Sequence, residues 1–163
     1  MSVLDLKNAA FSIKGGGSSD KVTVKLFQGT LSFNETKNRE YISDRGKLSG
    51  VKDGEEVPMD VNFSFIWEYL KAASGDPATV EDALKKRGVA AGWQSTDSDT
   101  CAPYCVDLEL VVTEPCTEGN VTTYLFPEFR YEKLDHDAKN ASVACSGKCN
   151  VTEPTITSVP VGT

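Results

Sequence analysis

The cysteines have the strongest potential for chemistry in this chain, because four of the five form two closely spaced pairs. The pairs are Cys101/Cys105 and Cys145/Cys149, each with three residues between its members. Four thiolates can hold a structural zinc, although zinc knuckles usually have the tighter C-x-x-C spacing. On a strand, the members of such a pair lie on one face about 13 Å apart, too far for a disulfide, whereas a turn brings them together. Pro103 and Gly147 favour turns, so we expect disulfides, with zinc binding and reduced thiols as the alternatives.

An odd number of cysteines leaves one thiol over after internal pairing. Cys116 lies in the sequence TEPCTEGN between two predicted strands, and we expect this loop to be exposed. If the thiols oxidise, the remaining cysteine is a candidate for a bond between subunits. The candidate disulfide residues are therefore Cys101, Cys105, Cys116, Cys145 and Cys149.

Disulfides are unusual in cytosolic proteins, yet we expect no signal peptide in the first eleven residues. Asp5 and Lys7 stand where such a peptide needs an apolar segment. We therefore expect the cysteines to leave the cell by another route, such as release in a virus particle on lysis.

The remaining polar residues do not form an enzyme signature. His136 is the only histidine and lies between Asp135 and Asp137, so we expect a solvated turn residue rather than half of a metal site. The run of glycines at 15–17 lacks the lysine and helix of a phosphate-binding loop, and it is interpreted as a hinge. We predict no catalytic residues, no cofactor and no metal site, and hence no enzyme.

Composition predicts one globular domain of ordinary polarity. The chain has 163 residues, 39% of them hydrophobic and 25% charged, with 17 basic and 24 acidic side chains and a formal charge of −7. This balance argues against binding to a phosphate backbone, which needs clustered Lys and Arg, but an acidic wall lets DNA slide past. Because no stretch approaches the roughly 20 apolar residues of a membrane-spanning helix, we expect no membrane anchor.

The segment 44–69 gives the clearest structural pattern. Asp53 and Gly54 predict the turn of a β-hairpin, and the preceding segment 34–44 is expected to be a polar loop. Alternating apolar residues then predict a strand with one buried face, namely Met59, Val61, Phe63 and Phe65. The period changes at 66–70 towards a turn of helix.

The remaining pattern predicts an antiparallel β-sandwich or barrel with one flanking α-helix. Strands are expected at 21–27, 30–33, 106–113 and 121–131, with Pro127 marking an edge or bulge. A helix is expected near 77–87, capped by Asp76 and closed by Gly88, and Trp93 is expected to plug the core. The predicted organisation is an N-terminal arm (1–20), a β-sandwich domain (21–151) and an extended C-terminal tail (152–163).

Residues 29–70 resemble the major tail tube proteins of tailed bacteriophages. The resemblance rests on GTLSF (29–33), SDRGKL (43–48), the Asp53-Gly54 pair and PMDVNFSFIWEYL (58–70). It implies a fold shared with type VI secretion tube proteins, and hexameric rings that stack around a channel for DNA during infection. It also implies a place in the virion tail after assembly in the host cytoplasm. The implied partners are further copies of the chain and the sheath, tape-measure and baseplate proteins, while DNA passes without specific binding.

Two other functions stay open at this point. The chain could be a different β-sandwich virion protein, such as a decoration or tail-tip component, which would not form tubes alone. It could also be a small β-rich binding module stapled by zinc at the cysteine pairs.

Overall fold

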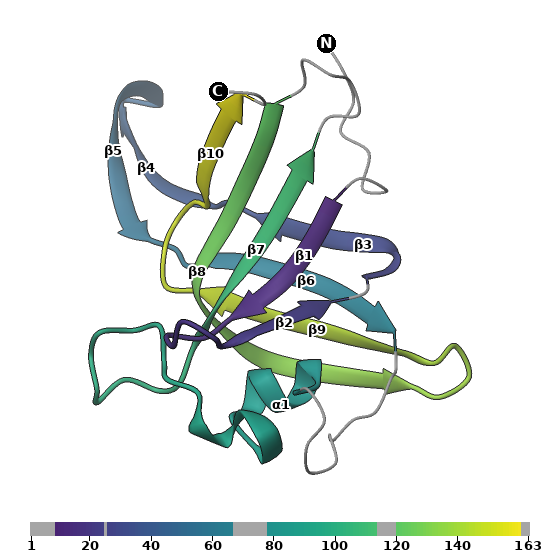
Figure 1. Ribbon diagram of the computed structural model, residues 1–163. Coiled ribbons are helices and arrows are strands. Elements are labelled where there is room, and N and C mark those ends of the chain that lie inside the picture. The colour runs from purple at the N-terminus through teal and green to yellow at the C-terminus, as the bar shows by residue number, and fades with distance from the viewer. Residues whose placement is uncertain (1–8, 25, 67–77, 114–119, 161–163) are drawn as a thin grey trace.

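The fold is mainly antiparallel β-structure in a computed structural model that describes residues 9–24, 26–66, 78–113 and 120–160 (Figure 1). The described strands are β1 (Ala9–Lys14), β2 (Lys21–Val24), β3 (Leu26–Asn34), β4 (Lys37–Asp44), β5 (Lys47–Glu56), β6 (Met59–Ile66), β7 (Val106–Thr113), β8 (Asn120–Asp137), β9 (Ser142–Cys149) and β10 (Thr155–Pro160). The helices of this described part are α1 (Val80–Lys85) and the 3-10 helix η2 (Gly88–Gly92).

The long strand β8 joins the two halves of a sandwich. The main sheet has the order β2-β1-β7-β8-β9-β6-β3, and β10 also pairs with β8. The first part of β8 pairs with β7 and β10, whereas its last part pairs with β9. Because the same strand belongs to both groups, the sheet folds over and its two halves pack face to face, with α1 flanking them. This confirms the predicted antiparallel β-sandwich with one α-helix.

The core follows the predicted alternation. On β6 and β7 every second side chain is buried, namely Met59, Val61, Phe63, Phe65, Val106, Leu108, Leu110 and Val112. Phe63 lies in an aromatic cluster, with ring centroids 5.2 Å from Phe11 and 6.0 Å from Phe129. Trp93 is buried as expected. The apolar period of two thus determines which face of each strand meets the other sheet.

Pro127 creates the predicted irregularity in β8. Val106 pairs with Phe129 but Leu108 pairs with Phe126, so β8 contains one extra residue at this point. Glu128 has a φ of 54°, and its backbone N–H donates to Asp107 Oδ1 at 3.1 Å. Since proline has no N–H to give to the ladder, the bulge is where β8 tolerates it.

The helix is shorter than predicted. Thr79 caps α1 by accepting a hydrogen bond from the N–H of Asp82, and Lys86 ends it in the left-handed conformation at φ 53°. The predicted cap, Asp76, lies outside the described residues. The capping box of Thr79 and Asp82 therefore provides the start signal that the sequence interpretation assigned three residues too early.

Both ends of the described chain contribute strands to the sheet, which differs from the expected arm at 1–20 and tail at 152–163. Strand β1 lies between β2 and β7, and Phe11 and Ile13 are buried in the core. The glycine run forms a turn held by Asp20, whose Oδ2 accepts the N–H of Gly17 at 2.9 Å. Strand β10 pairs along β8 over its full length.

The hairpin turn is not where the sequence pattern placed it. Asp53 and Gly54 lie within β5, and the reversal occurs at Arg45 and Gly46, with φ values of 54° and 81°. The segment expected to be a polar loop forms β4 instead. The left-handed pair gives a twist that suits a two-residue hairpin turn. Of the expected helical turn at 66–70, residue 66 ends β6 and the others lie outside the described residues.

Candidate interaction surface around a protruding hairpin

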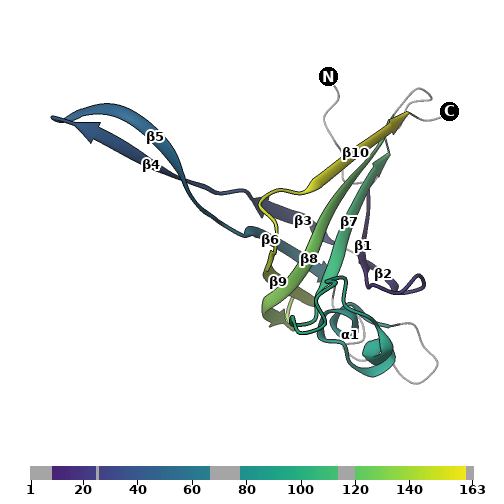
Figure 2. The same cartoon turned by 90° about the vertical axis from the view of Figure 1, so that its left-hand side faces the viewer.

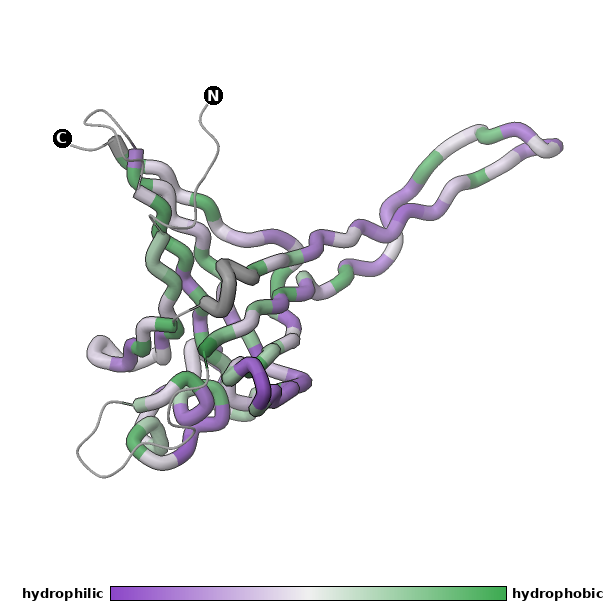
Figure 3. Tube along the Cα trace, turned by 90° about the vertical axis from the view of Figure 1, so that its right-hand side faces the viewer, coloured by the Kyte–Doolittle hydropathy of each residue, from purple (hydrophilic) through white to green (hydrophobic). Residues whose placement is uncertain are grey.

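Strands β4 and β5 form a separate two-stranded sheet that projects away from the sandwich (Figure 2). No residue of either strand is buried. Hydrophobic and hydrophilic residues are interspersed along the hairpin (Figure 3). Because an isolated two-stranded hairpin is only marginally stable in water, a long exposed one is unusual in a subunit that acts alone.

The register of the hairpin places three exposed apolar side chains on one side. Tyr41 pairs with Val51, and Leu48 pairs with Ser43 two residues further along the same face. We call Tyr41, Leu48 and Val51 the hairpin face; their exposed fractions are 63%, 77% and 52%. A bulge at Ser49 keeps Leu48 on this side, and the Ser49 hydroxyl donates to the carbonyl of Ile42 at 3.1 Å.

Charged side chains support the hairpin along its length. Lys52 Nζ lies 3.0 Å from Glu40 Oε2, and Lys37 Nζ lies 3.6 Å from Asp53 Oδ2. Exposed pairs of this kind contribute about 0–1 kcal/mol each, so they favour the register without holding the hairpin rigidly. At the turn, Arg45 and Lys47 stand against one carboxylate, Asp44, which pairs with Lys47, so the turn carries one net positive charge.

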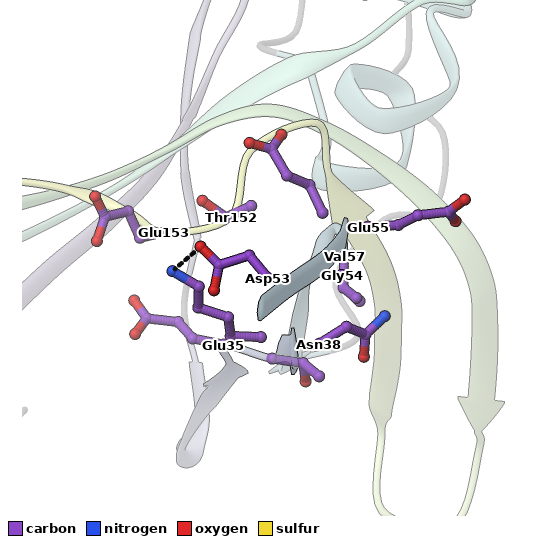
Figure 4. A pocket seen from close by; sticks show the side chains of 11 residues that line it. Glu35, Asn38, Asp53, Gly54, Glu55, Val57, Thr152 and Glu153 are labelled. Carbon is purple, nitrogen blue, oxygen red and sulfur yellow. Dashed lines mark ion pairs between the residues drawn. The ribbon is translucent and has the colours of Figure 1, made fainter. Parts of the chain in front are cut away.

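An acidic cavity lies at the root of the hairpin, where β4 and β5 leave the sandwich (Figure 4). Its volume is about 520 Å³. Lining side chains come from the β3–β4 connection, the start of β4, the end of β5 and the β9–β10 connection. They include five carboxylates and one lysine: Glu35, Asp53, Glu55, Glu56, Glu153 and Lys37. We call it the root cavity. Its excess of carboxylates makes it suited to a cationic group.

The sandwich is open between its edge strands β3 and β10. Ile156 pairs with Tyr124, which pairs with the buried Leu110, so the side chain of Ile156 is on the core face of the sheet. Even so, 59% of Ile156 is exposed. The ring of Phe33 packs at a tilt against the buried Phe126, with a centroid distance of 5.2 Å, and Phe33 is 38% exposed. We call Phe33 and Ile156 the open edge, because core-facing side chains there meet solvent.

The four cysteines in the described part of the chain are free thiols. Cys105, Cys145 and Cys149 are buried free thiols, Cys101 is an exposed free thiol, and Cys116 lies outside the described residues. Cys145 and Cys149 lie on one face of β9, so the turn that an internal bond between them requires is absent. Burial raises the pKa of each of these two thiols to about 12, which keeps them protonated and unreactive at neutral pH.

Gly147 therefore serves close packing rather than a turn. It pairs with Tyr131 next to a register shift in β8. A Cβ atom on Gly147 would lie 2.2 Å from the carbonyl oxygen of Arg130 and 2.8 Å from Cζ of Phe129. The backbone approach at this point leaves room for glycine alone.

His136 anchors the helix instead of lying in a solvated turn. It belongs to β8, and its Nε2 contacts Oε1 of the buried Glu81 in α1. Glu81 also pairs with Arg87 at 3.0 Å, and the buried Asp82 accepts from Arg87 Nε at 3.3 Å. Buried carboxylates need such partners, so the cluster fastens α1 to the sheet. The described residues contain no group of three or more His, Cys, Asp and Glu side chains placed to hold a metal ion.

The chain is similar in fold to parts of two contractile injection particles. One is a chain of the anti-feeding prophage cap, the tube terminating cap, with 12% identity, a TM-score of 0.53 and coverage of 98% of this chain and 93% of that one. The other is a chain of the sheath–tube complex of PVC, an extracellular contractile injection system, in the extended state. It has 10% identity, a TM-score of 0.51 and coverage of 96% of this chain and 93% of that one.

No protein-family model and no curated protein matches the sequence. At such low identities the structural likeness establishes a fold found in phage-tail-like particles. Within the described part of the chain, neither helix is long and apolar enough to cross a bilayer.

Sequence patterns missed the true hairpin turn and the open edge. The Arg45-Gly46 pair between Tyr41-Ile42 and Leu48-Val51 was an available signal for the turn. The open edge had no local signal, because its exposure arises from which strands are neighbours in the folded sheet.

Proposed function

We propose that this chain is a non-enzymatic structural subunit that assembles with copies of itself into a tube of a phage-tail-like particle. The observation that carries this proposal is the β4–β5 hairpin, which leaves the sandwich and exposes the hairpin face to solvent. Exposed apolar side chains gathered on an element outside the core mark interaction sites. The likeness to components of a tube cap and a sheath–tube complex agrees with this function.

The detailed proposal follows the resemblance to phage tail tube proteins. Hexameric rings would stack around a channel through which DNA passes without specific binding. Sheath, tape-measure and baseplate proteins would be the neighbours in the tail, and the particle would be assembled in the host cytoplasm. The net charge of −7 supports a channel wall that does not retain DNA.

A second candidate is a subunit that terminates a tube instead of building it. The likeness to the tube terminating cap favours it, since that structure is matched over 98% of this chain. The two candidates differ in what purified protein forms. A tube subunit gives stacks of rings of variable length at high concentration, whereas a terminating subunit gives single rings that do not stack.

Electron microscopy and light scattering of the purified chain test the proposal. We expect rings or tubes at high concentration, and monomers on dilution. The triple variant Tyr41→Ser, Leu48→Ser, Val51→Ser should remain folded, because these side chains make no contribution to the buried core. It should form at least tenfold less assembled material.

Val89→Ser provides a matched control, since Val89 is an exposed apolar residue in η2 on the sandwich body. It should assemble like the wild type. Wild-type protein that stays monomeric at all concentrations would contradict self-assembly, and normal assembly of the triple variant would remove the hairpin from the proposal.

A further inference from the structure

We propose that the open edge of one copy receives the hairpin face of a neighbouring copy. This inference rests on the self-assembly proposed above and assigns the second half of the contact. Each chain then contributes one hairpin and one seat. The seat consists of Phe33 on β3 and Ile156 on β10 as its apolar wall, with the root cavity at its base.

The exposed core at the open edge is the first reason. By register, Ile156 and Phe33 lie on the inner faces of the sandwich, where side chains are normally covered by the opposite sheet. Both are substantially exposed, and among the described strands none pairs with the outer side of β3 or β10. A flat apolar element that enters this opening would continue the core, and the hairpin face is such an element.

Geometry directs the hairpin to another copy. It projects away from its own sandwich, so its face and the open edge of the same chain are separated in space (Figure 2). A donor surface and an acceptor surface that are different parts of the same subunit make a heterologous contact. Repetition of such a contact gives a closed ring when the rotation closes and a helical filament when it does not.

Charge gives the contact a direction. The turn of the hairpin carries Arg45 and Lys47 against one carboxylate, Asp44, and is therefore net positive, whereas the root cavity presents an excess of carboxylates. Along β4, Arg45 is four residues from Tyr41, about 13 Å, and Glu153 of the cavity is three residues from Ile156, at most about 10 Å. The hairpin turn therefore reaches the root cavity when the hairpin face covers the open edge, and opposite charges steer that orientation.

Complementary variants test the pairing of the two surfaces. The hairpin variant is the triple serine substitution described above, and the edge variant is Phe33→Ser with Ile156→Ser. Neither should assemble alone. The edge variant keeps an intact hairpin face, and the hairpin variant keeps an intact seat. When the two are mixed in equal amounts, one such contact can form, so we expect 1:1 heterodimers that do not grow further. Circular dichroism and melting curves verify that both variants are folded.

The outcomes separate this inference from the proposed function. If the edge variant assembles like the wild type while the hairpin variant does not, self-assembly stands and the open edge is not the seat. That result would also be obtained if residues 1–8 of the same chain covered the edge. If the mixture gives no heterodimer although each folded variant fails alone, the two surfaces do not meet. If the wild type does not assemble, the proposed function itself is wrong.

Cross-linking tests the same contact with a positive signal, because it does not rely on a variant that fails to assemble. In a background with Cys101→Ser and Cys116→Ser, which removes the exposed thiol of Cys101 and the loop thiol of Cys116, Leu48→Cys and Ile156→Cys are placed on separate chains and treated with a short bismaleimide. We expect a covalent dimer from the mixture and at least tenfold less from either chain alone. A control pair with Val89→Cys in place of Ile156→Cys should not form the dimer. Equal cross-linking in the control pair would overturn the assignment.

Discussion

Replacing Phe63 by alanine tests whether the aromatic cluster between the sheets holds the subunit together. Phe63 is fully buried, and its ring lies 5.2 Å from Phe11, 5.9 Å from Phe65 and 6.0 Å from Phe129. Removing a buried phenylalanine ring costs about 3–5 kcal/mol, and each lost aromatic pair adds about 0.5–1.5 kcal/mol beyond simple burial. We therefore expect a loss near the top of the range, about 4–5 kcal/mol.

The measurement should isolate the stability of the subunit from that of the assembly, because binding between copies raises apparent stability by mass action. Urea unfolding in the background of the hairpin variant meets this requirement. For a chain of this size, each kcal/mol shifts the melting temperature by about 2–4 °C, so a decrease of about 8–20 °C is expected. Phe33→Ala is the control: its ring is 38% exposed, and it should cost less than half as much. A Phe63→Ala protein at least as stable as the Phe33→Ala protein would refute the placement of Phe63 at the centre of the core.

Two further predictions concern strand β9. Gly147→Ala should lower the free energy of unfolding by about 1–3 kcal/mol, because the new methyl group must displace the backbone of Arg130, and unchanged urea midpoints would contradict the close approach. For Cys145 and Cys149 the folded pKa of about 12 lies above the ordinary value of 9.0. Stability from burying the neutral thiols is therefore fully present below pH 9 and is lost as the pH rises from about 9 towards 12. Urea midpoints between pH 8 and pH 10.5 should fall more steeply for the wild type than for the Cys145→Ala, Cys149→Ala variant, and parallel curves would argue against buried thiols.

The predictable parts of the fold are the strands that have one face in the core and the other towards solvent. Strands β6 and β7 pack one face on the opposite sheet, so their apolar residues alternate and their positions were correctly predicted. Pro127 was also interpreted correctly, since a missing N–H restricts where a strand can accept proline. The prediction of a sandwich with one helix followed from these local signals.

The parts that were missed depend on contacts between segments that only the folded structure brings together. Strand β4 is exposed on both faces, so it lacks an apolar period and was mistaken for a loop. Asp53-Gly54 has the composition of a turn, but cross-strand pairing places it inside β5. His136 seemed to be a surface residue because its partner, Glu81, is distant in the chain. Predicting the open edge requires knowing where β3 and β10 lie relative to each other, and only the folded topology shows this.

The place of β1 in the sheet has a consequence for how the subunit is made. Its neighbour β7 lies about a hundred positions later in the chain, as the ion pair between Lys14 and Glu109, 95 residues apart, shows. A nascent chain cannot complete this sheet until β7 has left the ribosome, and such non-local pairing slows folding. The β4–β5 hairpin needs only local contacts and can form early. Strand β10 follows every other described strand, so translation order makes the open edge proposed above as a seat one of the last parts of the described fold to form.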